Sequence, residues 1–118
     1  MCSSDLPPSY MEAHAERLEA AAAGAPAALA PMSVAAARVR MLLEHDRLDD
    51  LPSIRAPVQV LAADDDILTP PALSRVIADA IEGADFVTLA GAHFHPLTDP
   101  AQFAAVVRRF VAEKAHET

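Results

Sequence analysis

Residues 57–95 constrain the fold of this chain more than any other part of the sequence. An apolar run at 58–63 is followed by a helical pattern near 70–81 and by a second apolar run at 86–90. Gln59 is the only polar residue of the first run, as expected for a strand of a parallel sheet with both faces covered. Strands joined by one crossover helix are parallel and right-handed. The pattern therefore predicts a βαβ unit and the α/β fold class.

Capping residues mark the expected ends of the helices. Thr69 is expected to cap the connecting helix, Pro70 to occupy its first position and Gly83 to end it. Its expected buried face comprises Leu73, Val76, Ile77, Ala80 and Ile81. Asp99 predicts the start of a last helix, and Gln102 three residues later comes close to a capping box. The expected buried face of that helix comprises Phe103, Val106, Val107, Phe110 and Val111.

The first part of the chain predicts helices and no strand. One helix is expected over 8–23, a proline-broken connection over 25–32 and a second helix over 34–47 with Ser33 as its N-cap. A linker follows at 48–56, where aspartates and a proline oppose regular structure. The two helices are rich in alanine and only moderately apolar. We therefore interpret them as a layer over another element.

Charge and composition exclude several classes of function. The net charge of −8 argues against nucleic-acid binding, because no basic patch could offset so many carboxylates. Cys2 is the only cysteine, so no disulfide framework or cysteine metal cluster is expected. No apolar stretch approaches the roughly 18 residues of a membrane span, and the start lacks the pattern of a signal peptide. These features favour a cytoplasmic protein that contacts neither nucleic acid nor membrane.

Ionisable side chains follow both predicted strands. Residues 64–66 are three aspartates, and His93 and His95 come after the second strand. Open α/β sheets bind ligands beyond the carboxyl ends of their strands, so an aspartate and a histidine can meet there. A carboxylate bonded to one imidazole nitrogen orients the ring and leaves the other nitrogen free to act as a base. Asp64 and Asp65 are more simply interpreted as a solvated turn.

A metal site is the alternative chemistry for these residues. A His-x-His pair can bind zinc, and aspartates could complete such a site. The rest of the sequence shows no metal-ligand spacing, and the aspartate triplet lacks the pattern of a calcium loop. We therefore expect no metal and no cofactor.

The same residues resemble the late region of the α/β-hydrolase family. That region runs strand, Gly-x-x-Asp-x-x-x-Pro, helix, strand, Gly-x-His and a helix opened by proline. Here the first motif occupies 63–70, the second 91–93, and Pro100 opens the last helix. The resemblance covers about 51–113 and departs at Ala63, where glycine is usual.

The resemblance implies a role for each of four residues. Asp66 corresponds to the acid of a catalytic triad and His93 to its base, while Phe94 and His95 are expected beside the pocket. The family also needs a nucleophile elbow, Gly-x-Ser-x-Gly. None of the serines in this chain has a glycine two residues away. We therefore expect the nucleophile to lie upstream of residue 1 and this chain alone to be inactive.

Within the family, the chain is most similar to the aminoacrylate hydrolases of pyrimidine (uracil) breakdown. The similar segments are 7–10, 15–18, the turn after the first strand, and 98–100. Such enzymes are expected to hydrolyse 3-aminoacrylate to malonic semialdehyde and ammonia. Ester and enol-lactone hydrolases share most of these features and remain alternatives, as does a non-catalytic small α/β binding module.

The resemblance also divides the chain. Residues 1–6 are expected to be a disordered or artefactual leader, 7–48 a helical cap region, and 49–118 the C-terminal βαβα part of an α/β-hydrolase domain. The expected fold is therefore an incomplete α/β domain, with parallel strands, flanking helices and preceding cap helices. Its expected partner is a small-molecule substrate, and homodimerisation of the full-length parent is left open.

Overall fold

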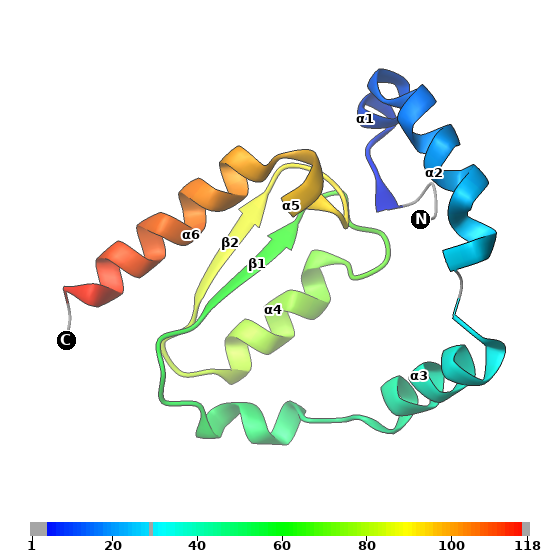
Figure 1. Cartoon of the computed structure of the whole chain (residues 1–118). Coiled ribbons are helices and arrows are strands. Elements are labelled where there is room, and N and C mark those ends of the chain that lie inside the picture. Colours follow the sequence, from blue (N-terminus) through cyan, green and yellow to red (C-terminus); the bar gives the residue numbers. More distant parts are fainter. Residues whose placement is uncertain (1–4, 29, 117–118) are drawn as a thin grey trace.

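A two-stranded parallel sheet organises the structure, a computed structural model that describes residues 5–28 and 30–116. β1 (Gln59–Ala63) pairs with β2 (Asp85–Leu89), in a register that sets Gln59 opposite Asp85 and Ala63 opposite Leu89. Both strands run in the same direction, and their carboxyl ends lie side by side (Figure 1). The predicted βαβ unit is confirmed, and each strand begins and ends within one residue of its expected bounds.

The helix α4 (Pro71–Ala80) connects the strands and packs mainly against β1. Its N-cap is Pro70, so the prediction of Thr69 as the cap is wrong. The helix also ends three residues before Gly83, which was expected to stop it. Gly83 has a φ of 73°, a left-handed conformation that glycine adopts without strain, and it turns the chain into β2.

A single helical turn, α5 (His95–Thr98), precedes the last helix, α6 (Pro100–Ala115). α4 and α6 lie on opposite sides of the sheet (Figure 1). The Asp99 carboxylate accepts a hydrogen bond from the backbone N–H of Gln102 at 3.0 Å, which confirms Asp99 as the N-cap. The Gln102 side chain bonds to His95 and not back to Asp99, so only half of the expected capping box forms.

Replacing Asp99 by alanine is expected to destabilise the first turn of α6. The variant loses the one side-chain acceptor that satisfies the Gln102 amide, at a cost of about 1 kcal/mol. Hydrogen exchange of that amide should therefore become about fivefold faster. Asp99→Asn keeps an acceptor and is the matched control; equal exchange in the alanine variant and the wild type would contradict the prediction.

The apolar faces of α4 and α6 were expected to be buried, and this prediction is wrong for most of their residues. On α4, Leu73, Val76 and Ile77 keep 42–58% of their surface exposed, whereas Ile81 just beyond the helix is buried. No residue of α6 is buried, and Val111 is mostly exposed. Periodicity identifies the apolar side of a helix, but it does not show whether another element covers that side.

Helices also make up the part of the chain before the sheet. These are α1 (Pro8–Ala13), α2 (Ala15–Ala28), α3 (Met32–Glu44) and the short 3-10 helix η2 (Leu48–Ser53). In Figure 1 they form an arc beside the sheet, in which η2 approaches α4. Among the described residues, no helix is both long and apolar enough to cross a membrane.

The bounds of these helices differ from the expected ones. The helix expected over 8–23 is interrupted at His14, and its second part continues through Gly24 to the end of α2. The prediction of a proline-broken connection over 25–32 is therefore wrong for its first residues, which are helical. Ser33 lies inside α3, whose N-cap is Pro31. The expected linker contains the turns of η2.

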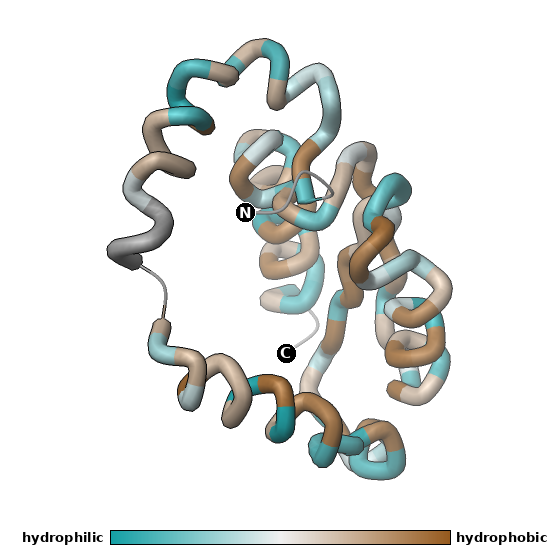
Figure 2. Tube along the Cα trace, turned by 90° about the vertical axis from the view of Figure 1, so that its right-hand side faces the viewer, coloured by the Kyte–Doolittle hydropathy of each residue, from teal (hydrophilic) through white to brown (hydrophobic). Residues whose placement is uncertain are grey.

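The chain is more extended than a compact domain of its length. Its radius of gyration is 17.3 Å, whereas about 13.5 Å is typical for a compact chain of this size. The buried apolar residues of the described part are mostly small or next to the strands: Leu6, Ala62, Ala63, Ala78, Ile81, Leu89 and Ala92. Figure 2 shows apolar stretches on α3, away from the sheet, where Leu43 is 83% exposed. The molecule therefore has a small core and large uncovered apolar surfaces.

Of residues 1–6, which were expected to form a disordered or artefactual leader, the structure describes Asp5 and Leu6. Asp5 and Leu6 are both buried. The carbonyl of Asp5 accepts a hydrogen bond from the backbone N–H of Phe94 at 3.1 Å. The rest of the expected leader, residues 1–4, lies outside the described residues. The segment at 5–6 therefore contacts the loop after β2.

Candidate active site

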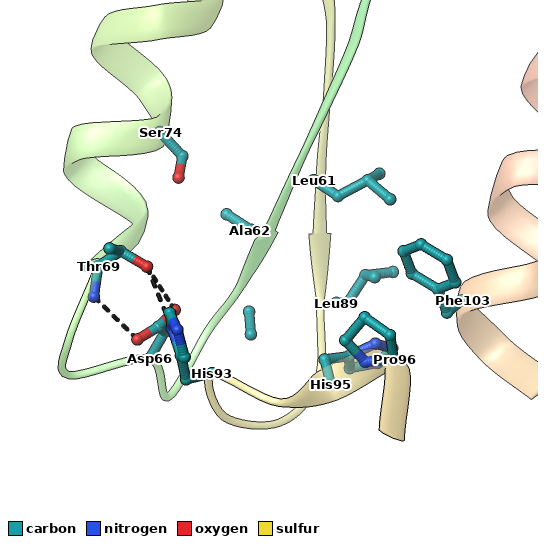
Figure 3. Close-up of a pocket in the computed structure, with 11 residues that line it drawn as sticks. Leu61, Ala62, Asp66, Thr69, Ser74, Leu89, His93, His95, Pro96 and Phe103 are labelled. Carbon is teal, nitrogen blue, oxygen red and sulfur yellow. Dashed lines mark hydrogen bonds and ion pairs between the residues drawn. The ribbon is translucent and has the colours of Figure 1, made fainter. Parts of the chain in front are cut away.

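Asp66 and His93 meet beyond the carboxyl ends of the two strands. Asp66 follows β1 and His93 follows β2, and the parallel register brings these two loops together. The Nδ1 atom of His93 lies 2.9 Å from Oδ2 of Asp66 (Figure 3). Asp66 is 8% exposed, whereas the His93 side chain is 34% exposed. A buried carboxylate therefore contacts an imidazole that solvent can still reach.

Hydrogen bonds hold the Asp66 carboxylate in its ionised form. Oδ1 accepts from the backbone N–H groups of Leu68 and Thr69, each at 2.9 Å, and Oδ2 accepts from the Thr69 hydroxyl at 2.7 Å. Burial raises the pKa of Asp66, but the bonds from the Thr69 amide, His93, the Thr69 hydroxyl and Leu68 together outweigh it. The net effect lowers the pKa from 3.8 to about 2. Asp66 is therefore an anion at neutral pH.

This geometry suits an orienting acid and a base. An ionised Asp66 accepts a hydrogen bond from the Nδ1–H of His93, which selects the neutral tautomer with a free Nε2 lone pair. The Nε2 atom can then accept a proton, and the carboxylate stabilises the imidazolium that results. The Phe94 ring packs edge-on against His93, with the ring centroids 5.4 Å apart. These contacts restrict the orientation of the imidazole.

Thr69 contributes to the pair in a way that the sequence reasoning missed. Its hydroxyl was expected to cap α4, but it donates to Asp66 and lies 3.3 Å from Nδ1 of His93. An N-cap threonine accepts a hydrogen bond from a backbone N–H of its helix, whereas the Thr69 hydroxyl donates to the charged carboxylate three residues earlier. A threonine three residues after an aspartate was the only sequence signal for this contact.

Replacing Thr69 by valine is expected to raise the pKa of Asp66 from about 2 towards 3.8. Valine has a similar shape but lacks the hydroxyl donor, and hydrogen bonds to ionised groups are among the stronger ones. Thr69→Ser keeps the donor and should leave the pKa unchanged. The titration is followed through the carboxyl ¹³C resonance of Asp66; identical curves for the valine and serine variants would refute the role of the hydroxyl.

The Asp64 carboxylate ties the loops after the two strands together, which was not expected. Its Oδ1 accepts from the backbone N–H of Gly91 at 2.8 Å, and the Asp65 N–H donates to the Gly91 carbonyl at 2.9 Å. Asp64 and Asp65 are otherwise exposed, as expected for a turn. Gly91 has a φ of 128°, which other residues rarely adopt. The turn thus anchors the loop that carries His93.

A cavity of about 220 Å³ opens beside the pair. Its lining includes both members of the pair and hydroxyl, imidazole and apolar side chains: Leu61, Ala62, Ala63, Asp66, Thr69, Ser74, Leu89, His93, His95, Pro96 and Phe103 (Figure 3). His95 lies on this lining, as expected, and is bonded to Gln102. Phe94, also expected there, contacts the His93 ring and is not among the lining residues. The two histidines face different partners.

Two curated relatives match nearly the whole chain. The RutD protein of Caulobacter sp. (strain K31), a carbamate hydrolase by name, is 34% identical over 110 residues, which cover 92% of this chain and 41% of the relative. RutD of Escherichia coli O6:H1, with the same name, is 33% identical over 111 residues, which cover 93% of this chain and 40% of the relative. This chain therefore spans about two fifths of these relatives. No protein-family model matches it.

Several of the similar solved structures are hydrolases by title. The α/β hydrolase MGS-M2, from a Medee basin deep-sea metagenome library, has a TM-score of 0.75 at 21% identity, covering 92% of this chain and 41% of MGS-M2. The enol-lactonase of Burkholderia xenovorans LB400 has a TM-score of 0.56 at 29% identity, covering 58% of this chain and 26% of the enzyme. Est816, described as an N-acyl homoserine lactone degrading enzyme, has a TM-score of 0.51 at 36% identity, covering 53% of this chain and 25% of Est816.

Proposed function

We propose that this chain, which has the fold of part of an α/β-hydrolase domain, provides the acid and the base of a hydrolytic triad. The observation that supports the proposal best is the 2.9 Å contact between His93 and Asp66 beyond the ends of two parallel strands. In this proposal His93 is the general base and Asp66 orients it. The nucleophile belongs to a polypeptide part that is not in the present sequence, since no serine here has the elbow pattern.

The roles follow from the geometry of the pair. Nε2 of His93 removes a proton from the nucleophile as that group attacks the substrate, and later delivers the proton to the leaving group. Asp66 remains ionised throughout because its pKa is about 2, so it stabilises the imidazolium without taking its proton. The adjoining cavity of about 220 Å³ fits a small substrate.

A small substrate whose nitrogen leaves as ammonia is our first choice. The relatives are carbamate hydrolases by name, and the resemblance of the sequence implies 3-aminoacrylate. In both hydrolyses water supplies an oxygen to carbon, the carbon–nitrogen bond breaks, and the nitrogen takes up one proton to leave as ammonia. In 3-aminoacrylate the second proton of water goes to the carbon next to the carboxylate. His93 would supply a proton to that nitrogen. The shared product is ammonia, so one assay covers both substrates.

A lactone or ester is the second candidate. The Burkholderia enol-lactonase and Est816 are 29% and 36% identical to the matching part of this chain, and both act on lactones by name. Here the proton from His93 goes to a leaving oxygen, and a carboxylic acid forms without ammonia. The same pair can serve both reactions, because His93 transfers a proton to the leaving atom whether that atom is nitrogen or oxygen.

The helices α1–α3 are proposed to form a cap region, corresponding to residues 7–48. The similarity to MGS-M2 covers 92% of this chain and therefore includes helices before the sheet, whereas that to the enol-lactonase covers 58%. A cap over the ends of the strands would help to shape the substrate cavity. The uncovered apolar side chains of α3 fit a helix that packs against a larger domain.

A chimera tests the function directly. This chain replaces the aligned two fifths of the Caulobacter relative, and the remaining part is expected to supply the nucleophile. The chimera is incubated with carbamate, 3-aminoacrylate and an enol-lactone, and release of ammonia or acid is measured above the spontaneous rate. Ammonia release supports the first choice, and acid release alone supports the second. A folded chimera that is inactive on all three would favour a non-catalytic binding module.

A further inference from the structure

The loop after β2 is held at several neighbouring positions. Gly91 is bonded to Asp64, His93 to Asp66 and His95 to Gln102. The first two bonds connect the loop to the turn after β1, and the third connects it to α6. His93 and His95 thus point to different elements although only one residue separates them (Figure 3).

His95 is the most buried polar side chain in the described part of the chain, with 3% of its surface exposed. Its Nε2 lies 2.9 Å from Oε1 of Gln102, and this acceptor selects the tautomer with the proton on Nε2. A Cβ added to Gly91 would lie 3.3 Å from Cδ2 of His95, so the imidazole packs directly against the backbone of the loop. The ring therefore fills the space between the loop and α6.

The buried imidazole carries a free-energy cost. Among the described residues, Nδ1 of His95 is the buried side-chain nitrogen or oxygen without a hydrogen-bond partner. An unpaired buried acceptor is unfavourable, so packing alone does not account for a histidine at this position. The Nε2–H donor supplies what an apolar side chain could not, namely a directed bond to Gln102. Gln102 is itself positioned, because its backbone N–H is bonded to Asp99 at the start of α6.

We propose that His95 is a positioning residue for His93, acting through its bond to Gln102 and its contact with Gly91. Its importance for catalysis rests on the proposed function, in which His93 is the base. The His95–Gln102 bond fastens the base-bearing loop to α6, while Asp64 fastens it to the other strand end. With both attachments in place, the His93 ring is kept against Asp66. Loss of the α6 attachment lets the loop move, and the His93–Asp66 bond opens more often.

The test measures the His93–Asp66 bond and not activity. In the 118-residue chain, solvent exchange of the His93 Nδ1 proton is followed by ¹H NMR in His95→Ala, Gln102→Met and the double variant. Gln102→Met keeps the length of the side chain but removes the acceptor. Exchange is expected to become at least tenfold faster than in the wild type in each single variant. The double variant should exchange no faster than the single variants, because all three lack the same bond. Gln102→Glu retains an acceptor and should exchange like the wild type.

Two results would overturn the proposal. One is unchanged exchange in Gln102→Met, which decides the question even if His95→Ala fails to fold by circular dichroism. The other is a double variant in which the increase in exchange rate equals the product of the increases in the two single variants. That result would mean that His95 and Gln102 act independently of each other. Arg109→Ala, at an exposed position of α6, controls for general effects on the helix. An inactive chimera would disprove the proposed function without altering these exchange rates, so the two failures are distinguishable.

Discussion

Replacing His93 by glutamine in the chimera is expected to lower kcat by about 10⁴-fold, with little change in KM. Glutamine retains a polar side chain of similar reach, but it cannot take up and return a proton near neutral pH. The loss therefore falls on the chemical step and not on substrate binding. Asp66→Asn should lower kcat to a similar extent, because an amide cannot hold the Nδ1–H tautomer of His93 as a carboxylate does.

Asp65→Asn is the matched control for this experiment. Asp65 is the residue next to Asp66 and carries the same charge, but its side chain is exposed and no bond to His93 involves it. The control variant should keep most of the activity, provided that circular dichroism shows all variants to be folded. Equal losses in Asp65→Asn and Asp66→Asn would show that general charge, and not the His93 contact, is responsible. An active His93→Gln chimera would refute the role of the base.

Acidification is expected to destabilise the chain through Asp66, with most of the loss between pH 4 and pH 2. The pKa of Asp66 is lowered from 3.8 to about 2 in the folded chain. The unfolded chain therefore binds the proton first as the pH falls, and the folded state loses its advantage until the pH reaches about 2. Above pH 4 the contribution is complete and amounts to about 2 kcal/mol.

A variant isolates this contribution from those of the other carboxylates. The free energy of unfolding is measured by urea titration for the wild type and Asp66→Asn at several pH values. At pH 7 the variant should be less stable by about 2 kcal/mol, and the difference should shrink towards pH 2. Asp65→Asn should show no such convergence. A difference between wild type and Asp66→Asn that stays constant over this range would contradict the lowered pKa.

Local signals were enough to predict the βαβ unit that carries the candidate site. The apolar runs of the strands and the helical spacing between them depend on residues close in sequence, so the βαβ unit could be predicted. Because strands in such a unit are parallel, their carboxyl ends meet at one edge of the sheet. The placement of Asp66 beside His93 follows from that topology. The cap at Asp99 was equally predictable, since its partner Gln102 lies only three residues away.

The individual hydrogen bonds that hold the loop after β2 in place were not predictable. The Asp64 bond to Gly91 joins residues 27 positions apart, and the His95 bond to Gln102 depends on how α6 leaves the loop. The Thr69 side chain could also have accepted a bond from the start of the following helix, and only the folded loop shows that its hydroxyl donates to Asp66. A hydrogen bond requires a specific distance and angle, and neither is encoded in residue type alone.

The sequence by itself determined the order of the elements and the α/β class, because these depend on periodicity and on spacing along the chain. The resemblance to the α/β-hydrolase motif then singled out Asp66 and His93 among the aspartates and histidines that follow the strands. Only the tertiary structure decided which apolar surfaces are covered and how the base-bearing loop is held. Leu73 and Ile81 show the difference, since both belong to one predicted face but only Ile81 is buried. Burial depends on what packs against a side chain, and that is a property of the assembled fold.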